Sequence, residues 1–388
     1  MQADVVVVGG GPSGLAFVRA LAGTGLEVVL IERQPLASLR EPAPDGREIA
    51  LTHRSMATLR TLGAWAQLAP EDMAPLREAR VLNGRSPFAL SFDPQGAGEP
   101  LGQLVSNHRI RRTLFRTVAE QPGLTLIAGT GVASVRTDRA GASVTLADGR
   151  MVRGRLLVAA DSRLSAMRDQ LGISAEINRL DRSMLVCRVA HEGDHHGVAT
   201  EWFDHGQTIA MLPLNGRMSS AVLTLAPAET DRLAHGGAEA LGAEITRRYA
   251  GRLGQMRVVE GPHVYPLVTS YADHFAAPRA ALIGDAAVGM HPVTAHGFNL
   301  GLQGAMTLAG LIGEAASAGR DIASSWLLRR YEATHRIASR PLYEATNFLV
   351  RLYSDERLVA RMARSATLRA GAALPFVRPA ISRLLMQH

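Results

Sequence analysis

Residues 4–14 read Asp-Val-Val-Val-Val-Gly-Gly-Gly-Pro-Ser-Gly, and this stretch decides the fold. The valines at 5–8 predict a strand that is buried on both faces. A helical apolar pattern follows over 15–22, and a second buried strand is expected at 27–31, just before Glu32. The stretch therefore predicts a strand–turn–helix–strand unit of an α/β fold.

The glycine spacing in this unit is typical of a dinucleotide site. Gly9 permits a tight turn, Gly11 lets the backbone approach a pyrophosphate, and Gly14 lets the helix pack on the strand. The helix N-terminus offers free N–H groups to phosphates, and Glu32 can accept hydrogen bonds from a ribose. A glycine-rich structural turn is the alternative, but the order of the elements favours FAD or NAD. The candidate contacts of the unit are Gly9, Gly11, Ser13, Gly14, Glu32 and Arg33.

Two further predicted strands end in an acid. The apolar run at 156–160 leads to Asp161, and the run at 281–284 leads to Asp285. A glycine-containing turn at 291–301 follows the second of them and precedes a helix of small residues over 302–316. The three motifs are far apart in the sequence, so a common role requires a fold that brings them together.

These motifs resemble those of the single-component FAD-dependent aromatic hydroxylases, and within that family the ubiquinone-biosynthesis ring hydroxylases. The resemblance spans about 1–340 and becomes looser in the connecting β segments. The positions that match the second and third family motifs are Asp161, Ser165, Arg168, Gly284, Asp285, His291, Pro292, Gly297, Asn299 and Gly301. The positions that depart from them are Ser162, Ala295 and His296, where the family has Gly, Gly and Gln.

The resemblance implies that FAD is the bound cofactor and that NAD(P)H visits transiently as its reductant. It implies hydroxylation of a phenolic, prenylated ring with O₂, and it names no catalytic side chain; Tyr265, Pro266 and His296 are candidates to line the reactive face. Asp161 could instead cap the following helix, and Arg47 could be a surface arginine. The FAD-binding residues that the resemblance adds are Arg47, Asn107, Asp161, Asp285, Pro292, Gly297, Phe298 and Asn299.

The expected fold class is α/β, with a Rossmann-like FAD-binding domain interleaved with a mixed or antiparallel β-sheet substrate domain, plus C-terminal helices. The FAD-binding domain is expected in three pieces, and alternating apolar residues predict the strands between them. The tail is expected to pack on the core or to meet an anionic membrane or partner proteins, since arginines accompany its apolar residues. The expected pieces are 1–70, 101–178 and 266–340 for FAD, 71–100 and 179–265 for substrate, and 341–388 for the helical tail.

Composition excludes several other classes of protein. All 42 Lys+Arg positions are arginine, so neither a Schiff-base lysine nor a P-loop lysine is present. The single Cys187, flanked by apolar residues, predicts a buried strand thiol and no cysteine metal cluster. The chain carries a net charge of +7 but no recognisable nucleic-acid-binding module.

No membrane span or secretory leader is recognised, which predicts a cytoplasmic protein that is peripheral, at most, at the inner face of the membrane. A second strand–G-x-G-x-x-G–helix unit is missing, which argues against a two-dinucleotide reductase. Three alternatives to hydroxylation stay open: a flavin-dependent isoprenoid reductase, a halogenase, and a non-catalytic FAD-bound scaffold of a biosynthetic complex. The halogenase is disfavoured because such enzymes usually carry a lysine that this chain lacks.

Overall fold

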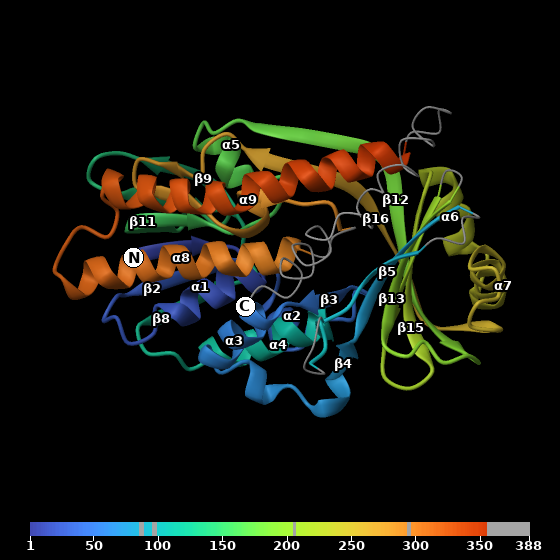
Figure 1. Cartoon of the computed structure of the whole chain (residues 1–388). Helices are drawn as coiled ribbons and strands as arrows, with labels where there is room; N and C mark the ends of the chain where they lie inside the picture. Colours follow the sequence, from blue (N-terminus) through green and yellow to red (C-terminus); the bar gives the residue numbers. More distant parts are fainter. Residues whose placement is uncertain (85–88, 95–98, 205–206, 293–295, 355–388) are drawn as a thin grey trace.

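The computed structural model describes residues 1–84, 89–94, 99–204, 207–292 and 296–354 (Figure 1). An α/β region holds the N-terminus, and a large sheet on the other side of the molecule carries its own helices. A small sheet lies between them. This confirms the expected mixed α/β class with C-terminal helices.

The first sheet assembles the three predicted strand motifs. Its parallel core places β1 between β11 and β2, with Val7 paired to both Val158 and Leu30. An antiparallel hairpin, β9 (Val132–Thr137) and β10 (Ala142–Leu146), joins at β11. The strand order is β17 (Ala276–Ala277), β18 (Ala280–Leu282), β11 (Met151–Ala159), β1 (Gln2–Val8), β2 (Val28–Glu32) and β8 (Leu124–Ala128).

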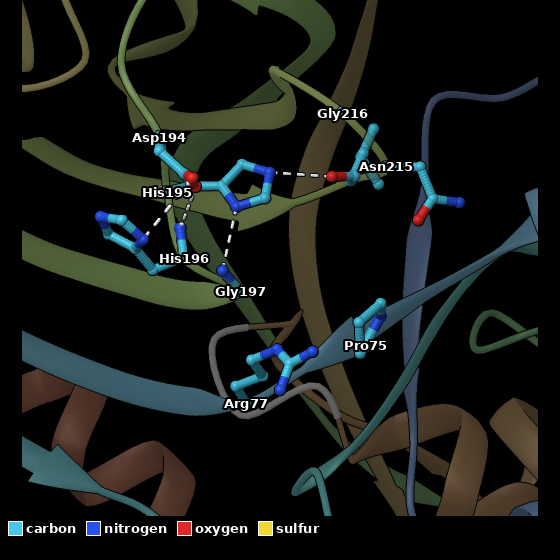
Figure 2. A pocket seen from close by; sticks show the side chains of 9 residues that line it. Pro75, Arg77, Asp194, His195, His196, Gly197, Asn215 and Gly216 are labelled. Carbon is cyan, nitrogen blue, oxygen red and sulfur yellow. Dashed lines mark hydrogen bonds and ion pairs between the residues drawn. The ribbon is translucent and has the colours of Figure 1, made fainter.

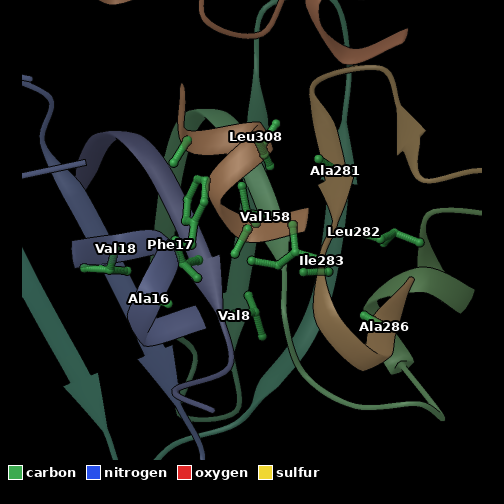
Figure 3. Close-up of a cluster of buried hydrophobic side chains, with 14 of the residues drawn as sticks. Val8, Ala16, Phe17, Val18, Val158, Ala281, Leu282, Ile283, Ala286 and Leu308 are labelled. Atoms are coloured by element: carbon green, nitrogen blue, oxygen red, sulfur yellow. The ribbon is translucent and has the colours of Figure 1, made fainter. Parts of the chain in front are cut away.

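Helices pack against this sheet through fully buried apolar side chains. Phe17 of α1 and Leu308 of α8 belong to one cluster with Val8 and Val158 (Figure 3). Removing this apolar surface from water stabilises the region by about 25 cal/mol per Å². The helices of this region are α1 (Pro12–Ala20), α2 (Leu36–Arg40), α3 (His53–Thr61), α4 (Asn107–Val118), α5 (Ala166–Gln170), α8 (Gly297–Ser317) and α9 (Ser325–Ser354), with 3₁₀ turns η1 (Trp65–Gln67), η2 (Pro70–Asp72) and η3 (Gly284–Ala286).

The large sheet is antiparallel except where β13 runs parallel to β5. One face packs on α6 (Pro227–His235) and α7 (Ala238–Arg248), and the buried Cys187 lies in that core. Burial raises the pKa of the Cys187 thiol to about 12, as expected for a structural thiol. The strand order is β19 (Val288–Gly289), β16 (Met256–Ala272), β12 (Ala175–His191), β15 (Met218–Leu225), β14 (Gln207–Pro213), β13 (Val198–Asp204), β5 (Glu78–Asn83) and β6 (Ala89–Phe92).

The small sheet, β3 (Glu48–Leu51), β7 (Gly102–Ser106) and β4 (Met73–Leu76), lies between the two regions. Three long elements cross the expected domain borders: β12 crosses 178/179, β16 crosses 265/266, and α9 crosses 340/341. Continuous strands therefore join the expected FAD-binding pieces to the expected substrate pieces. The division of the chain into these two domains stays a prediction. No helix within the described ranges is long and apolar enough to span a bilayer.

The helix expected at 302–316 begins earlier, at Gly297 of α8. Glycine disfavours a helix interior, so sequence propensity placed the start too late. Close packing accounts for these glycines. A Cβ added to Gly301 would come 2.8 Å from Ser13 Oγ, and one on Gly304 would come 2.7 Å from His335 Nε2.

Candidate functional site

The turn after β1 has the shape that a pyrophosphate requires. Gly9 has φ +112°, and a Cβ there would collide with the backbone of Ala160. A Cβ on Gly14 would collide with the carbonyl oxygen of Gly9, whereas the space around Gly11 is open to 4 Å. Gly11 caps α1 and Pro12 occupies its first turn, so the free N–H end of the helix opens onto that space.

Glu32 lies at the end of β2, beside this turn. Its carboxylate accepts hydrogen bonds from the backbone N–H of Gly10 (2.6 Å) and of Gln34 (2.8 Å). These bonds fix an acceptor where a nucleotide ribose would meet the end of the strand. Arg33 is exposed and makes no hydrogen bond or ion pair within the described part of the chain.

Ser13 has a packing role in addition to its place in the motif. A Cβ on Gly284 would come 2.7 Å from its Oγ, and one on Gly301 would come 2.8 Å from the same atom. The starts of α1 and α8 and the turn η3 therefore converge at one point. The first and third sequence motifs are thus neighbours in space, as their predicted common role requires.

Asp161 supports the N-terminal cap of the helix that follows it. Its carboxylate accepts a hydrogen bond from the Ser165 hydroxyl (2.5 Å), and Ser165 in turn caps α5 through the N–H of Arg168 (2.9 Å). The fully buried Arg168 guanidinium reaches the carbonyl oxygens of Arg163 (3.1 Å) and Ala286 (3.4 Å). The second motif therefore supports the η3 turn, and capping is compatible with a cofactor contact.

Asp285 lies in η3 and forms an ion pair that the sequence did not reveal. Arg163 donates to one carboxylate oxygen from Nε (3.2 Å) and Nη2 (2.9 Å). The same arginine donates from Nη1 to the Val268 carbonyl of β16 (2.9 Å). Asp285 is still 40% exposed, so its second oxygen is available to a ligand. Only its position after Asp161 and Ser162 distinguishes Arg163 in the sequence.

Arg47 belongs to a polar cluster around Asp45. Asp45 accepts from Arg47 (2.6 Å) and from the Asn107 side-chain amide (2.7 Å), and its carbonyl accepts from the Tyr265 hydroxyl (2.8 Å). Burial alone would raise the pKa of Asp45, but the charge and hydrogen bonds of Arg47 hold it below its usual value. The cluster joins the loop before β3 to β16 of the large sheet. Arg47 is therefore exposed but held by Asp45, and its contact with the cofactor stays a prediction.

The turn before α8 carries the last predicted contacts. The Asn299 amide donates to the Ala50 carbonyl (2.9 Å) and its oxygen accepts from the Thr52 N–H (3.3 Å), which fastens α8 to β3. Gly297 and Phe298 form the first turn of α8, and Phe298 packs on the core. Pro292 is exposed, and Ala295 lies outside the described residues.

The buried histidines flanking this turn are His291 and His296. Burial, with a smaller effect of Arg163, lowers the pKa of His291 to about 4, so this side chain is neutral at physiological pH. His296 is the N-terminal cap residue of α8.

The large sheet turns an apolar patch and a charged cluster toward the α/β region. Met184, Val186 and Leu267 form the patch, and Tyr265 packs on it. Beside it, Arg188 pairs with the buried Glu48 of β3 (2.6 Å). Burial raises the pKa of Glu48 in spite of the lowering effect of Arg188.

Arg188 also contacts Ser106 (2.6 Å) and Glu260 (3.2 Å), so the charged cluster joins β3, β7, β12 and β16. Pro266 is exposed and pairs with Ser183, whereas Tyr265 pairs with Met184 of the patch. Pro266 therefore points to the opposite face of the sheet from Tyr265. Neither Glu48 nor Arg188 belongs to a recognisable motif, which is why sequence reasoning missed them.

A separate surface pocket of about 480 Å³ lies at the turn between β12 and β13 (Figure 2). His195 donates from Nε2 to the Leu214 carbonyl (2.8 Å) and accepts at Nδ1 from the Gly197 N–H (3.0 Å). His196 is exposed and lies 3.6 Å from Asp194. His195 therefore stabilises this turn.

The turn at 9–14, Glu32 and Asp285 together form a cradle for a dinucleotide. The fold and this cradle define an FAD-dependent oxidoreductase. The chain belongs to the FAD binding domain family, whose sequence profile matches residues 2–346. It is 44% identical to ubiquinone hydroxylase UbiM of Neisseria meningitidis, over 99% of this chain and 85% of the relative. It is 36% identical to ubiquinone hydroxylase UbiL of Rhodospirillum rubrum, over 100% of this chain and 89% of the relative.

Solved structures share the fold at low identity. p-Nitrophenol 4-monooxygenase PnpA of Pseudomonas putida matches with a TM-score of 0.77 at 20% identity, covering 98% of this chain and 97% of that one. The flavin-dependent monooxygenase PieE, solved with FAD and substrate, matches with a TM-score of 0.76 at 18% identity, covering 100% of this chain and 71% of that one. The chain is an FAD-dependent monooxygenase, and the family resemblance seen in its sequence is confirmed.

Proposed function

We propose that this chain hydroxylates the aromatic ring of a phenolic, prenylated precursor in ubiquinone biosynthesis, with NAD(P)H as reductant and O₂ as oxidant. The strongest support is its 44% identity, over nearly its whole length, to a ubiquinone hydroxylase. The residues at the cradle fit FAD, since Gly11 leaves room for a pyrophosphate and Glu32 and Asp285 offer acceptors to hydroxyl groups.

The protein's own residues bind and orient the cofactor in this proposal. Backbone N–H groups at the start of α1 hold the pyrophosphate, Glu32 holds the adenosine ribose, and Asp285 accepts from the ribityl chain. The N-terminal end of α8 carries a partial positive charge that would stabilise negative charge on a bound flavin. FAD, when bound, supplies the redox chemistry that activates O₂.

The large sheet would position the substrate ring and exclude water. Met184, Val186 and Leu267 offer an apolar surface to an aromatic ring and its prenyl tail. Arg188 and Glu48 keep the two regions in contact at the edge of this surface. A dry, apolar site suits an oxygen transfer that water would otherwise divert.

We also propose that α9 brings the protein to an anionic lipid surface, where a prenylated substrate resides. Among the α9 side chains that the structure describes, three large apolar ones are exposed: Trp326 by 64%, Ile337 by 78% and Phe348 by 62%. They recur every eleven residues, which is three helical turns with a drift of about 20°, so they form one stripe. Exposed arginines 329 and 330 lie near its start, as expected for a helix lying on a membrane.

The proposed reaction is tested with the purified holoenzyme and a phenol that carries a short prenyl tail. NAD(P)H consumption should rise when this phenol is added, and ¹⁸O from ¹⁸O₂ should appear in the ring. An isoprenoid reductase would reduce a double bond without incorporating oxygen, and a halogenase would require halide. A non-catalytic scaffold would consume neither NAD(P)H nor O₂. Any of these three results would contradict hydroxylation.

A further inference from the structure

Glu201 of β13 begins a row of side chains that crosses the large sheet. It pairs with Ala210 of β14, which pairs with Val222 of β15. Val222 pairs with Val186 of β12, and Val186 pairs with His263 of β16. Residues directly opposite each other in an antiparallel ladder point to the same face, so these five side chains share one face of the sheet.

That face is the one turned toward the α/β region. A Cβ on Gly46, in the loop that carries Arg47, would come 2.8 Å from His263 Cδ2 and 3.4 Å from Val186 Cγ1. Arg188, two residues after Val186, reaches Glu48 of the small sheet from the same face. The other face is covered by α6 and α7. Glu201 therefore lies on the same face as the apolar patch, three strands or about 14 Å from it, a span that a substrate ring near Glu201 and its prenyl tail on the patch can cover together.

Glu201 is a carboxyl group in apolar surroundings. On this face its cross-strand neighbours are Val81 of β5 and Ala210 of β14, and its neighbours along β13 are Ala199 and Phe203. Its side chain makes no hydrogen bond or ion pair with any residue that the structure describes. Burial alone raises the pKa of the Glu201 carboxyl to about 8.

Within the described residues, no ionisable side chain of the strands next to β13 faces Glu201. On this face β14 offers Thr208 and Leu212 beside Ala210, and β5 offers Ala79 and Asn83 beside Val81. Strand β4, which contacts β14, reads Met-Ala-Pro-Leu. The charged groups nearest along the row of strands are Arg188 and Glu260, three and four strands away. A part-buried carboxyl without a partner destabilises the fold, and a ligand hydroxyl would offset that cost.

We propose that Glu201 binds the ring hydroxyl of the phenolic substrate and accepts its proton. The O–H bond of the phenol breaks, the proton moves to a carboxylate oxygen of Glu201, and the electron pair stays on the phenolate oxygen. A phenolate ring is richer in electrons than a phenol ring, which favours attack on an electrophilic oxygen. This assignment rests on the proposed function, because it needs a phenolic substrate.

The raised pKa suits such a base. A phenol titrates near 10 in water, whereas an ordinary glutamate titrates near 4.3 and is too weak a base to compete for its proton. A carboxyl that titrates at about 8 has a pKa closer to that of the phenol and is therefore a stronger base. Because only the ionised carboxylate can accept the proton, substrate-dependent turnover should rise as the pH increases through about 8.

The experiment compares Glu201→Gln and Glu201→Leu with Glu239→Gln, an exposed carboxyl on α7 at the opposite face of the sheet. Each holoenzyme is titrated with a short-tailed prenylphenol and with its O-methyl ether, and turnover is measured from pH 6 to 9. Wild type and Glu239→Gln should prefer the phenol. Glu201→Leu should bind the phenol about 10- to 100-fold more weakly, the usual effect of losing a hydrogen bond to a charged group. Glu201→Gln should lose the rise in turnover near pH 8.

Binding of the ether tests whether the variants keep an intact site. Equal ether affinity in wild type and both Glu201 variants, together with weaker phenol binding in the Leu variant, supports the assignment. Unchanged phenol affinity and an unchanged pH profile in both variants overturn it, while the proposed hydroxylation stands. If wild type binds neither compound and consumes no NAD(P)H with the phenol, the proposed function itself fails.

Discussion

At the residue scale, Asp285 has two expected roles, one in an ion pair and one in cofactor binding. Its carboxylate is paired with Arg163 and is also the expected acceptor for the ribityl hydroxyls of FAD. Arg163 extends this pair to the Val268 carbonyl of the large sheet, so the pair can orient Asp285 without any cofactor. These roles predict different consequences for substitutions at the two positions.

Asp285→Asn keeps the size of the side chain and removes its charge. We expect FAD to bind about 10- to 100-fold more weakly, because a hydrogen bond to a charged acceptor contributes about 1.5–3 kcal/mol. Titration of the apoprotein with FAD, followed by flavin fluorescence, measures the change. Arg163→Gln is the matched control, since it breaks the ion pair but leaves the acceptor. Equal losses in both variants would show that the pair, not the acceptor, is what FAD binding needs.

Glu32 allows a second test of the cradle. Glu32→Gln keeps the size of the side chain but retains only one of the two oxygens that accept from the Gly10 and Gln34 N–H groups, and it removes the charge-assisted bond to the ribose. FAD affinity should fall, while thermal stability without FAD should fall by no more than the loss of one hydrogen bond, about 1 kcal/mol. If the variant keeps full affinity for FAD, Glu32 only stabilises the turn and makes no contact with the ribose.

The sequence predicted those residues of the site whose role depends on local geometry. Gly9, Gly11 and Gly14 are recognisable because a turn and a helix start require them within six positions. Arg163 and Asp285 are separated by 122 positions, and no local pattern relates them. Glu201 was missed for the same reason, since only the strand pairing of the folded sheet shows which face it occupies.

At the element scale, the packing of α8 on α9 contains a buried histidine. His335 of α9 lies against Gly304 of α8, stacks with Tyr331 and contacts Phe275. Neither of its ring nitrogens has a hydrogen-bond partner in the described structure. Burial lowers the pKa of His335 to about 4, so the side chain is neutral in the folded protein.

This histidine makes stability depend on pH. The unfolded chain binds a proton at His335 below about pH 6.5, whereas the folded chain does so only near pH 4. The unfolded state therefore binds more protons in this window, and stability should fall as the pH decreases from 6.5 toward 4, by up to about 1.4 kcal/mol per pH unit. Urea unfolding at pH 7, 6 and 5 measures this slope.

His335→Leu should reduce the slope and leave stability at pH 7 equal or higher, because an apolar side chain needs no partner there. Some slope should remain, since the pKa of His291 is also lowered to about 4. A variant with the same slope as wild type would show that His335 stays neutral in both states or finds a partner on unfolding.

At the scale of the whole molecule, a prenylated substrate must leave a lipid phase before it reaches the large sheet. The sequence predicted a basic, amphipathic tail from 341 onward, and its arginines 361 and 364 lie outside the described residues. Within the described residues, α9 continues through Pro341 and carries Trp326, Ile337 and Phe348 along one exposed stripe. Sequence periodicity alone did not separate this stripe from the buried side of the helix, where Tyr331 and Tyr343 pack.

Replacing the stripe by serine, as Trp326→Ser, Ile337→Ser and Phe348→Ser together, should weaken sedimentation with vesicles that contain anionic phospholipid. The side chains are exposed, so FAD content, thermal stability and turnover of a short-tailed phenol should stay close to wild type. Turnover of a long-tailed lipid in vesicles should fall. Met151→Ser with Val259→Ser, which removes apolar side chains exposed elsewhere, is the matched control. Arg361→Glu with Arg364→Glu tests the charge of the tail, since each basic residue near an anionic surface contributes about 1 kcal/mol.

The results distinguish membrane binding through the apolar stripe of α9 from binding through the basic tail. If the stripe variant alone loses vesicle binding at low and high salt, α9 inserts its apolar side chains into the interface, because apolar contacts persist when salt screens charge. If only the tail variant loses binding, and only at low salt, the attraction is electrostatic and lies beyond α9. Wild-type protein that stays in solution with these vesicles under both conditions would contradict membrane docking, and the stripe would then need another partner to cover it.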